Sequence, residues 1–164
     1  MRFFPLLMTL LLVAACRIEP VPSGTVQRQG AATPGLPRRV SVQFYLIYEA
    51  PSPTLTERKV ETTGETIFLA SRPDLTERDM AWAEMQVDSL SARASVLVHF
   101  TPIGADKLAA LTKQNIGRRM AIMIDGRTLA TPLITSEISD GRATIQGFKS
   151  ASEAQRVADS LAQR

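Results

Sequence analysis

The sequence predicts an α+β fold, in which a mainly antiparallel sheet of about five to seven strands carries two or three helices on one face. Three observations predict it. Several runs alternate between apolar and polar residues, as strands do. An Asp-Gly pair at residues 125–126 separates two such runs, and two later segments begin with helix-capping residues. The length of 164 residues is typical of one folded domain, and no internal repeat is visible.

The first strands are predicted directly after a proline-rich N-terminal region. Residues 40–49 alternate in the manner of a strand, and Pro51 and Pro53 end the run. Residues 57–65 are charged, which indicates a loop or a short edge strand. Residues 66–70 are apolar and indicate a further short strand.

The segment after residue 75 combines helix and strand signals. Thr76 with Asp79 three residues later is a variant of the capping box. Apolar residues then follow at helical spacing: Met80, Ala83 and Val87. We predict a helix here, of about two turns only, because residues 84–90 also alternate like a strand.

A second helix is predicted after a strand at residues 95–100. Thr101 is a suitable N-cap, and Pro102 occupies the first helical position. Asn115 and Gly117 tolerate left-handed backbone and suit the end of this helix. One face of the helix is formed by small and apolar residues: Ala105, Leu108, Ala109 and Thr112.

A hairpin is predicted around Asp125-Gly126, between strands at residues 120–124 and 128–134. A type I′ turn needs positive φ at both central positions, and Asp-Gly suits it. Pro132 indicates an edge or a bulge in the returning strand.

The C-terminal part is predicted to form one more strand and a helix. Asp140-Gly141 is a second turn signal, before a strand at residues 143–146. Ser150 and Glu153 have the spacing of a capping box. The helix that follows has an apolar stripe: Ala154, Val157, Ala158 and Leu161.

The first 15 residues have the layout of a signal peptide. Arg2 precedes an apolar run from residue 3 to residue 13. That run is too short to span a membrane, which takes about 20 residues. Residues 1–15 are therefore predicted to be removed.

Val13-Ala14-Ala15-Cys16 resembles the lipobox of bacterial lipoproteins. In that family the cysteine is acylated and becomes the first mature residue, which implies lipid attachment at Cys16. An ordinary signal peptide is the alternative. Arg17 stands where aspartate would resemble an inner-membrane retention signal, so the outer membrane is weakly favoured.

Residues 16–39 are rich in proline and glycine and have no apolar period. They predict a flexible tether between the membrane and a domain at residues 40–164. Arginines outnumber acidic residues in this tether, which would suit contact with anionic lipid headgroups. A solvated tether is the simpler interpretation.

Composition argues against several classes of function. The formal net charge is only +3, which does not indicate a nucleic-acid-binding surface. The chain has one cysteine and one histidine, so an internal disulfide is excluded and a zinc site is not expected. No metal site, cofactor or nucleic-acid partner is predicted.

No catalytic residue is predicted either. His99 stands on an expected strand, opposite in orientation to its neighbours, and no Gly-x-Ser-x-Gly motif accompanies it. A structural or surface role is expected for it. Asp125 and Asp140 are explained by turn chemistry, and whether they approach each other as a carboxylate pair stays open at this point.

From about residue 73 onward the chain resembles the first periplasmic domain of SecD, an accessory subunit of bacterial protein export, and most closely its head subdomain. Many small motifs in order carry the resemblance: Leu75-Thr76 with Asp79 and Ala83, Val96 to Phe100 with Gly104, Leu111-Thr112 with Asn115 and Gly117, Ala121-Ile122 with Asp125-Gly126, Pro132, and Gly141, Ile145 and Gly147 before Glu153-Ala154. The resemblance implies turn or close-packing roles, not catalysis, for Asp125, Gly126, Gly141 and Gly147.

The chain also departs from that family. Asp140-Gly141 stands where the family usually has two glycines, and none of the membrane spans of SecD is visible. The resemblance therefore implies a related periplasmic module that is lipid-anchored and is not a translocation motor.

The function expected is that of a protein-binding module that engages an export component or an extended polypeptide. An exposed sheet edge could accept a strand from such a partner. The alternatives are a structural envelope lipoprotein or an inhibitor of an envelope hydrolase. An enzyme of unknown type is a further class, which the residues do not favour.

Overall fold

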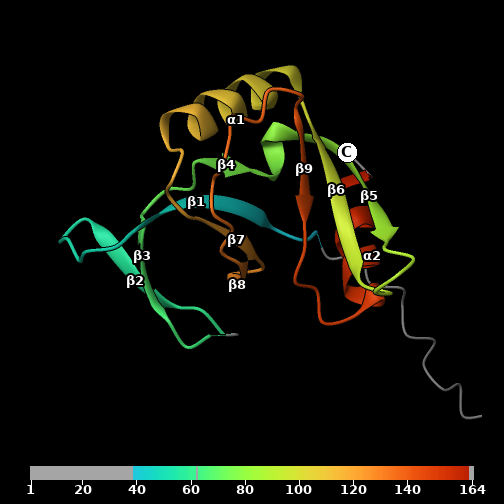
Figure 1. Ribbon diagram of the computed structural model, residues 1–164, viewed down its shortest axis with the longest axis horizontal. Coiled ribbons are helices and arrows are strands. Elements are labelled where there is room, and N and C mark those ends of the chain that lie inside the picture. Colours follow the sequence, from blue (N-terminus) through green and yellow to red (C-terminus); the bar gives the residue numbers. More distant parts are fainter. Residues whose placement is uncertain (1–38, 62, 163–164) are drawn as a thin grey trace, which may run out of the picture. The chain divides into compact units, whose positions relative to one another are not determined.

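The computed structural model describes residues 39–61 and 63–162 (Figure 1). The elements follow one another as β1 (Val42–Tyr48), β2 (Leu55–Lys59), β3 (Thr66–Ala70), β4 (Leu75–Thr76), the 3₁₀ turn η1 (Glu77–Asp79), β5 (Met80–Val87), β6 (Ala94–Phe100), α1 (Pro102–Gln114), β7 (Met120–Ile124), β8 (Arg127–Ala130), β9 (Arg142–Ile145) and α2 (Ala151–Ala162). In Figure 1, β2 and β3 lie on the left, β1 and β7 near the centre, and β5, β6 and α2 on the right.

The larger sheet has six strands in the order β2-β3-β1-β7-β8, with β4 also paired to β1. All of these pairs are antiparallel. Residues 42–46 of β1 pair with β7, whereas Ile47 and Tyr48 pair with β3. All five residues of β7 are buried, because both faces of this strand are covered. β1 and β7 therefore form the centre of the sheet.

The smaller sheet has three antiparallel strands in the order β5-β6-β9. Its inner face carries Val96 and Val98, which are fully buried, and α2 packs against β5 and β6. Its outer face carries Trp82, Glu84 and His99, which are wholly or partly exposed. The alternation along β6 therefore separates a core face from a solvent face.

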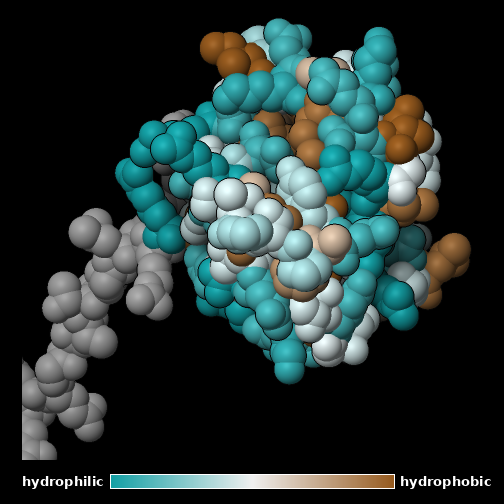
Figure 2. Space-filling model, turned by 90° about the vertical axis from the view of Figure 1, so that its left-hand side faces the viewer, coloured by the Kyte–Doolittle hydropathy of each residue, from teal (hydrophilic) through white to brown (hydrophobic). Residues whose placement is uncertain are grey.

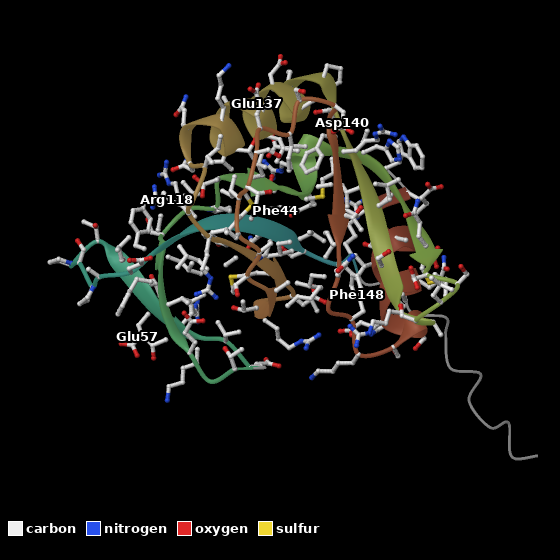
Figure 3. The ribbon with its side chains drawn as sticks, viewed as in Figure 1. Phe44, Glu57, Arg118, Glu137, Asp140 and Phe148 are labelled. Atoms are coloured by element: carbon white, nitrogen blue, oxygen red, sulfur yellow. The ribbon has the colours of Figure 1, made fainter. Side chains whose placement is uncertain are left out.

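One large hydrophobic core joins the two sheets and both helices. Phe44 projects from β1 into this core, where its ring meets that of Phe100 edge to face at 6.0 Å (Figure 3). α1 contributes Leu108 to the core, and the predicted stripe of α2 contributes Ala154, Val157, Ala158 and Leu161. A second cluster on the other face of the larger sheet contains Ile47, Val60, Ile67, Leu69, Ala121 and Met123.

The α+β class, the antiparallel pairing and the two C-terminal helices are confirmed. Thr101 caps α1, since its hydroxyl oxygen accepts a hydrogen bond from the backbone N–H of Gly104 at 3.0 Å. The charged segment after Pro53 contains the edge strand β2. The strands divide between two sheets, although one sheet was predicted. β1 and β6 never pair, and periodicity alone does not reveal which strands do.

The predicted helix after Thr76 is wrong. Thr76 and Asp79 do form a capping box, but it encloses only the single turn η1, and β5 begins at Met80. The pairing with β6 shifts its register between Met80 and Trp82, as at a β-bulge. Met80 and Ala83 therefore both face the core three residues apart, a spacing that resembles a helix. Val87 is 53% exposed and does not continue the apolar face.

Candidate functional site

The Asp125-Gly126 turn joins β7 to β8 and also holds the start of β1. Asp125 has φ +50° and Gly126 has φ +81°, the signs that a type I′ turn requires. The backbone N–H of Ser41 donates to Oδ1 of Asp125, and the N–H of Asp125 donates to the carbonyl of Ser41, both at 2.9 Å. The Asp125 carboxylate therefore has a structural role, because it ties the start of β1 to the turn.

The other two predicted turn residues lie at separate places in the fold. Gly141 has φ +67°, and a Cβ atom there would come within 3.0 Å of Cβ of Ala105 on α1. Gly147 has φ +101°, and a Cβ atom there would come within 3.1 Å of the carbonyl oxygen of Leu129. Neither has room for a side chain, and both are close-packing positions. Cys16 lies outside the described residues.

Asp140 binds within its own turn. Its carboxylate accepts hydrogen bonds from the backbone N–H and from Nε of Arg142, at 3.2 and 3.0 Å. These bonds, the backbone one foremost, lower the pKa of Asp140. No hydrogen bond links it to Asp125, whose carboxylate is held by Ser41, so the described contacts give no paired-carboxylate site.

A cleft of about 820 Å³ lies between the two sheets. It is lined by the β5–β6 hairpin, by β7 and β8, and by the connection from β9 to α2, namely Asp88, Ser91, Ala92, Arg93, Ala94, Ser95, Ile122, Ala130, Pro132, Thr144, Gln146, Gly147, Phe148, Lys149, Ser150 and Ala151. Phe148, labelled in Figure 3, packs against the core from this side. The lining mixes small polar and apolar groups, and the hydroxyl that meets a carboxylate in it, that of Ser91 with Asp88, belongs to a hydrogen-bonded loop turn.

Asp88, the acidic residue in the lining of this cleft, is hydrogen-bonded within its own loop. The carboxylate of Asp88 accepts hydrogen bonds from the backbone N–H groups of Leu90 and Ser91 and from the Ser91 hydroxyl, at 2.6–3.0 Å. The backbone N–H of Ser91 is the main reason that the pKa of Asp88 lies below its usual value. Arg93 and Lys149 are therefore the charged side chains in the lining that do not hold the loop.

An ion-pair cluster fastens α2 to the larger sheet beside the cleft. Arg127 binds Glu153 and lies 3.5 Å from the carboxylate of Glu61, while the backbone N–H of Lys149 donates to Glu153 at 2.9 Å. Burial raises the pKa of Glu153, but the Lys149 N–H and the Arg127 guanidinium outweigh this, so the pKa lies below its ordinary value. Ser150 accepts a hydrogen bond from the Glu153 N–H, while the Glu153 carboxylate reaches Lys149, one residue earlier than a capping box requires.

His99 stacks flat on Trp82 on the outer face of the smaller sheet. The two ring centroids are 3.7 Å apart and the planes are inclined by 8°. Nε2 of His99 is buried and has no hydrogen-bond partner among the described residues. A general base would need a nucleophilic side chain within hydrogen-bond distance of an imidazole nitrogen, and no such contact is described for His99. The stacking on Trp82 fits the structural role that was expected.

The free edges of the two sheets differ in charge. β2, at the edge of the larger sheet, has the sequence Leu-Thr-Glu-Arg-Lys and is largely exposed. Figure 2 shows the side on which β2 and β3 lie, and hydrophilic residues predominate there. β5, at the edge of the smaller sheet, has one charged residue among eight. Trp82, 43% exposed, lies on β5, and Leu90, 96% exposed, lies on the loop after it.

The part of the chain that the structure describes contains no group of three or more histidine, cysteine, aspartate and glutamate side chains placed to hold a metal ion. Within residues 39–61 and 63–162, no helix is long and apolar enough to cross a membrane.

Comparison with known proteins identifies the domain. The family model described as SecDF, P1 head subdomain, matches residues 52–163, which is more than half of the chain. The chain belongs to the SecDF P1 head family.

Relatives of this family include whole translocase subunits. The SecDF protein translocase subunit of Thermus thermophilus is 43% identical over 86 residues, which are 52% of this chain and 12% of that protein. The SecD subunit of Acidaminococcus fermentans is 33% identical over 118 residues, 69% of this chain and 28% of that protein. The chain thus spans less than a third of the length of either relative.

Solved structures of SecDF share the fold. A crystal structure of SecDF in a super-membrane-facing form is 32% identical, with a TM-score of 0.61, over 75% of this chain and 18% of that one. A second structure, of a membrane component SecDF that enhances protein export, is 28% identical with a TM-score of 0.60, over 75% of this chain and 62% of that one. The expected resemblance to the SecD head subdomain is confirmed.

For this SecD-type head, sequence reasoning missed Trp82 and the β5 edge. Both lie in the segment that was predicted to be a helix. The strand-like alternation of residues 84–90 pointed the other way, and the pairing with β6 confirms it for residues 84–87, while residues 88–90 lie in the loop. The cleft was also missed, because it is lined by three segments that are distant in sequence.

Proposed function

We propose that this protein is a lipid-anchored, periplasmic binding module that engages a protein partner in protein export. In this proposal Cys16 carries the lipid, residues 16–39 are the tether, and the head-type domain faces the periplasm. The outer membrane is weakly favoured as its site. The partner is a translocon component or an extended polypeptide.

The membership in the SecDF P1 head family is the observation that supports the proposal most. Both relatives described above are protein translocase subunits, and one of the similar structures is of a SecDF that enhances protein export. A head domain of this type on a lipid anchor would hold a surface for a protein partner close to a membrane.

The surface chemistry also suits binding. The cleft between the sheets and the free edge of β5 offer concave and extended contact surfaces, respectively. The acidic groups in and beside the cleft have structural partners: Asp88 binds Ser91 of its own loop, Glu61 lies next to Arg127 of β8, and Glu153 binds the Lys149 N–H. We therefore assign no catalytic step to the domain.

Affinity capture with the intact lipoprotein tests the proposal. Recovery of translocon subunits, or of an exported chain in transit, is expected. The Cys16→Ser variant is the matched control, because it keeps the domain and loses the proposed anchor. Recovery of an envelope hydrolase would instead favour an inhibitor, and recovery of no specific protein would contradict a binding role.

Lipid attachment has its own test. Cells that express the protein should incorporate radioactive palmitate into it, and Cys16→Ser should abolish this label and leave an uncleaved or soluble form. Equal labelling of the variant would show that Cys16 is not the acylated residue.

A further inference from the structure

We propose that the free edge of β5 is a docking site for an extended, positively charged polypeptide segment, which adds a fourth strand to the smaller sheet and sets a lysine or arginine side chain against Glu84 and Trp82. This inference rests on the proposed binding function and names the surface and the partner chemistry.

The first step is that, among the described residues, β5 pairs with β6 alone, and its one β-bulge lies at its start, between Met80 and Trp82. Edge strands in soluble proteins are commonly protected by charged side chains, by proline or by shortness. β2 carries Glu57, Arg58 and Lys59, and Glu57 projects outward from it in Figure 3. β8 and β9 are short, with four residues each. β5 has eight residues and a single charge, so it is the longest edge and the least charged for its length.

The second step is that β5 carries an exposed aromatic side chain. Trp82 is 43% exposed, although its ring lies against that of His99. The stack holds the indole in one orientation, so a ligand would meet an ordered surface. Aromatic and opposite-charge pairs across strands each stabilise a sheet, and an added strand would bring its own side chains opposite those of β5.

The third step is a carboxylate next to that ring. Glu84 is the one charged residue of β5, and it is exposed. Trp82 and Glu84 are two residues apart on the same face, opposite His99 and Leu97 of β6. Among the described contacts of Glu84, Nε2 of Gln86 donates to it at 3.4 Å, and no described ion pair includes it. The nearest cation along the register, Arg142, is bound to Asp140.

These features together select the charge of the partner. A tryptophan ring attracts lysine and arginine cations, and Glu84 attracts them as well. An acidic side chain at the same position would meet a like charge. An extended segment with a basic residue between two apolar ones therefore fits this edge, and an acidic segment does not.

The test uses two synthetic peptides that differ in one residue, Thr-Val-Thr-Lys-Thr-Val-Thr and the same sequence with glutamate in place of lysine. Each is labelled with fluorescein, and its binding to the full chain is measured by anisotropy at pH 7.5. The lysine peptide is expected to bind about fivefold more tightly, from one opposite-charge pair gained and one like-charge pair avoided.

Variants of the protein locate the site. Glu84→Lys should reverse the preference between the two peptides, and Glu84→Gln should reduce it to the smaller preference that the Trp82 ring supplies. Glu57→Lys, the same change on the other exposed edge, should leave the preference unaltered. A lysine peptide that is N-methylated at every residue keeps its side chains but has no backbone N–H to donate to β5, and its binding should be lost. Melting curves verify that each variant folds.

Three outcomes would overturn the inference. Peptide binding that Glu84→Lys does not alter would place the site elsewhere and leave the proposed binding function intact. A dimer in sedimentation that Glu84→Lys dissociates would assign the edge to a second copy of this chain. Failure of both peptides to bind would remove the edge as a docking site, while affinity capture would still decide the proposed function independently.

Discussion

Two hairpins of the domain, β7–β8 and β5–β6, use the same secondary structure for different purposes. The β7–β8 hairpin has a two-residue turn, lies in the larger sheet and is nearly all buried. The β5–β6 hairpin has a longer loop, lies in the smaller sheet and exposes one edge and one face. Its loop is ordered by Asp88 and includes Ala92 at φ +53°, a value uncommon for residues other than glycine.

The difference indicates where stability and where binding reside. Changes in the β7–β8 hairpin should act on the core and on the folding of the whole domain. Changes on the outer face and in the loop of the β5–β6 hairpin should act on surface contacts with little loss of stability, since only its inner face, with Val96 and Val98, belongs to the core. Four predictions test this division, from the largest expected effect to the smallest.

Truncating a core side chain of β7 should have the largest effect. Ile124 is 3% exposed and pairs with Val42 at the centre of the larger sheet. Ile124→Ala should lower the free energy of unfolding by about 2–5 kcal/mol, from lost burial and the cavity left behind. Leu90→Ala, at a side chain that is 96% exposed, should change it by less than about 0.5 kcal/mol. Urea denaturation measures both, and similar losses would contradict the division.

The two turns should respond in opposite directions. A β-branched residue at φ +81° is strained, so Gly126→Val should cost about 1–3 kcal/mol of stability. Nothing lies within 4 Å of a Cβ atom at Gly126, so the backbone angle alone is responsible. Ala92→Gly relieves a positive φ and should leave the melting temperature unchanged or raise it. A melting temperature that Gly126→Val does not lower would show that the turn tolerates the strain.

Acid should weaken the attachment of α2 through Glu153. Its pKa is lowered in the folded state from an ordinary value of 4.5. The stability it contributes is therefore complete above pH 4.5 and is lost as the pH falls through the folded-state pKa. Glu153→Gln should cost about 1–2 kcal/mol at pH 7, because Arg127 loses a charged hydrogen-bond partner.

Between pH 5 and strong acid, Glu153→Gln should lose less stability than the natural protein does, because it has no carboxylate to protonate at this position. Thermal melts at several pH values measure this difference. Asp88→Asn, in the other hairpin, is the matched control for acid sensitivity of a surface loop. Parallel pH profiles for the natural chain and for Glu153→Gln would show that another group dominates acid unfolding.

The smallest effect is expected for Asp125→Asn. Asparagine tolerates positive φ, and its side-chain oxygen can still accept the hydrogen bond from Ser41. The melting curve and the capture of partners should therefore both stay the same. Loss of partner capture with an unchanged melting curve would make this loop a binding element and would place function in the buried hairpin after all.

Local signals allowed many elements to be predicted to within a few residues. Thr101 and Pro102 begin α1, residues 66–70 form β3, and Asp125-Gly126 stands between β7 and β8. Each of these signals acts within a few residues of chain, through a cap, an alternation or a turn. The helix prediction after Thr76 failed because a register shift in β5 produced helical spacing of buried residues on a strand.

The candidate surface was less predictable than the fold. That an exposed edge could accept a strand follows from the chemistry of any sheet. Which strand is the edge depends on the order β5-β6-β9, and that order is set by pairing between segments far apart in sequence. Trp82 is the single tryptophan of the chain, yet its exposure follows only from that order.

The sequence by itself determined the class of fold, the starts of α1 and α2, the Asp-Gly turns and the family, because each depends on short-range chemistry or on motifs in order. Only the tertiary structure decided that the strands form two sheets, that a cleft lies between them and that β5 has a free edge. Those properties arise from long-range packing, in which β1 and β7 are covered on both faces while β5, among the described residues, pairs with β6 alone.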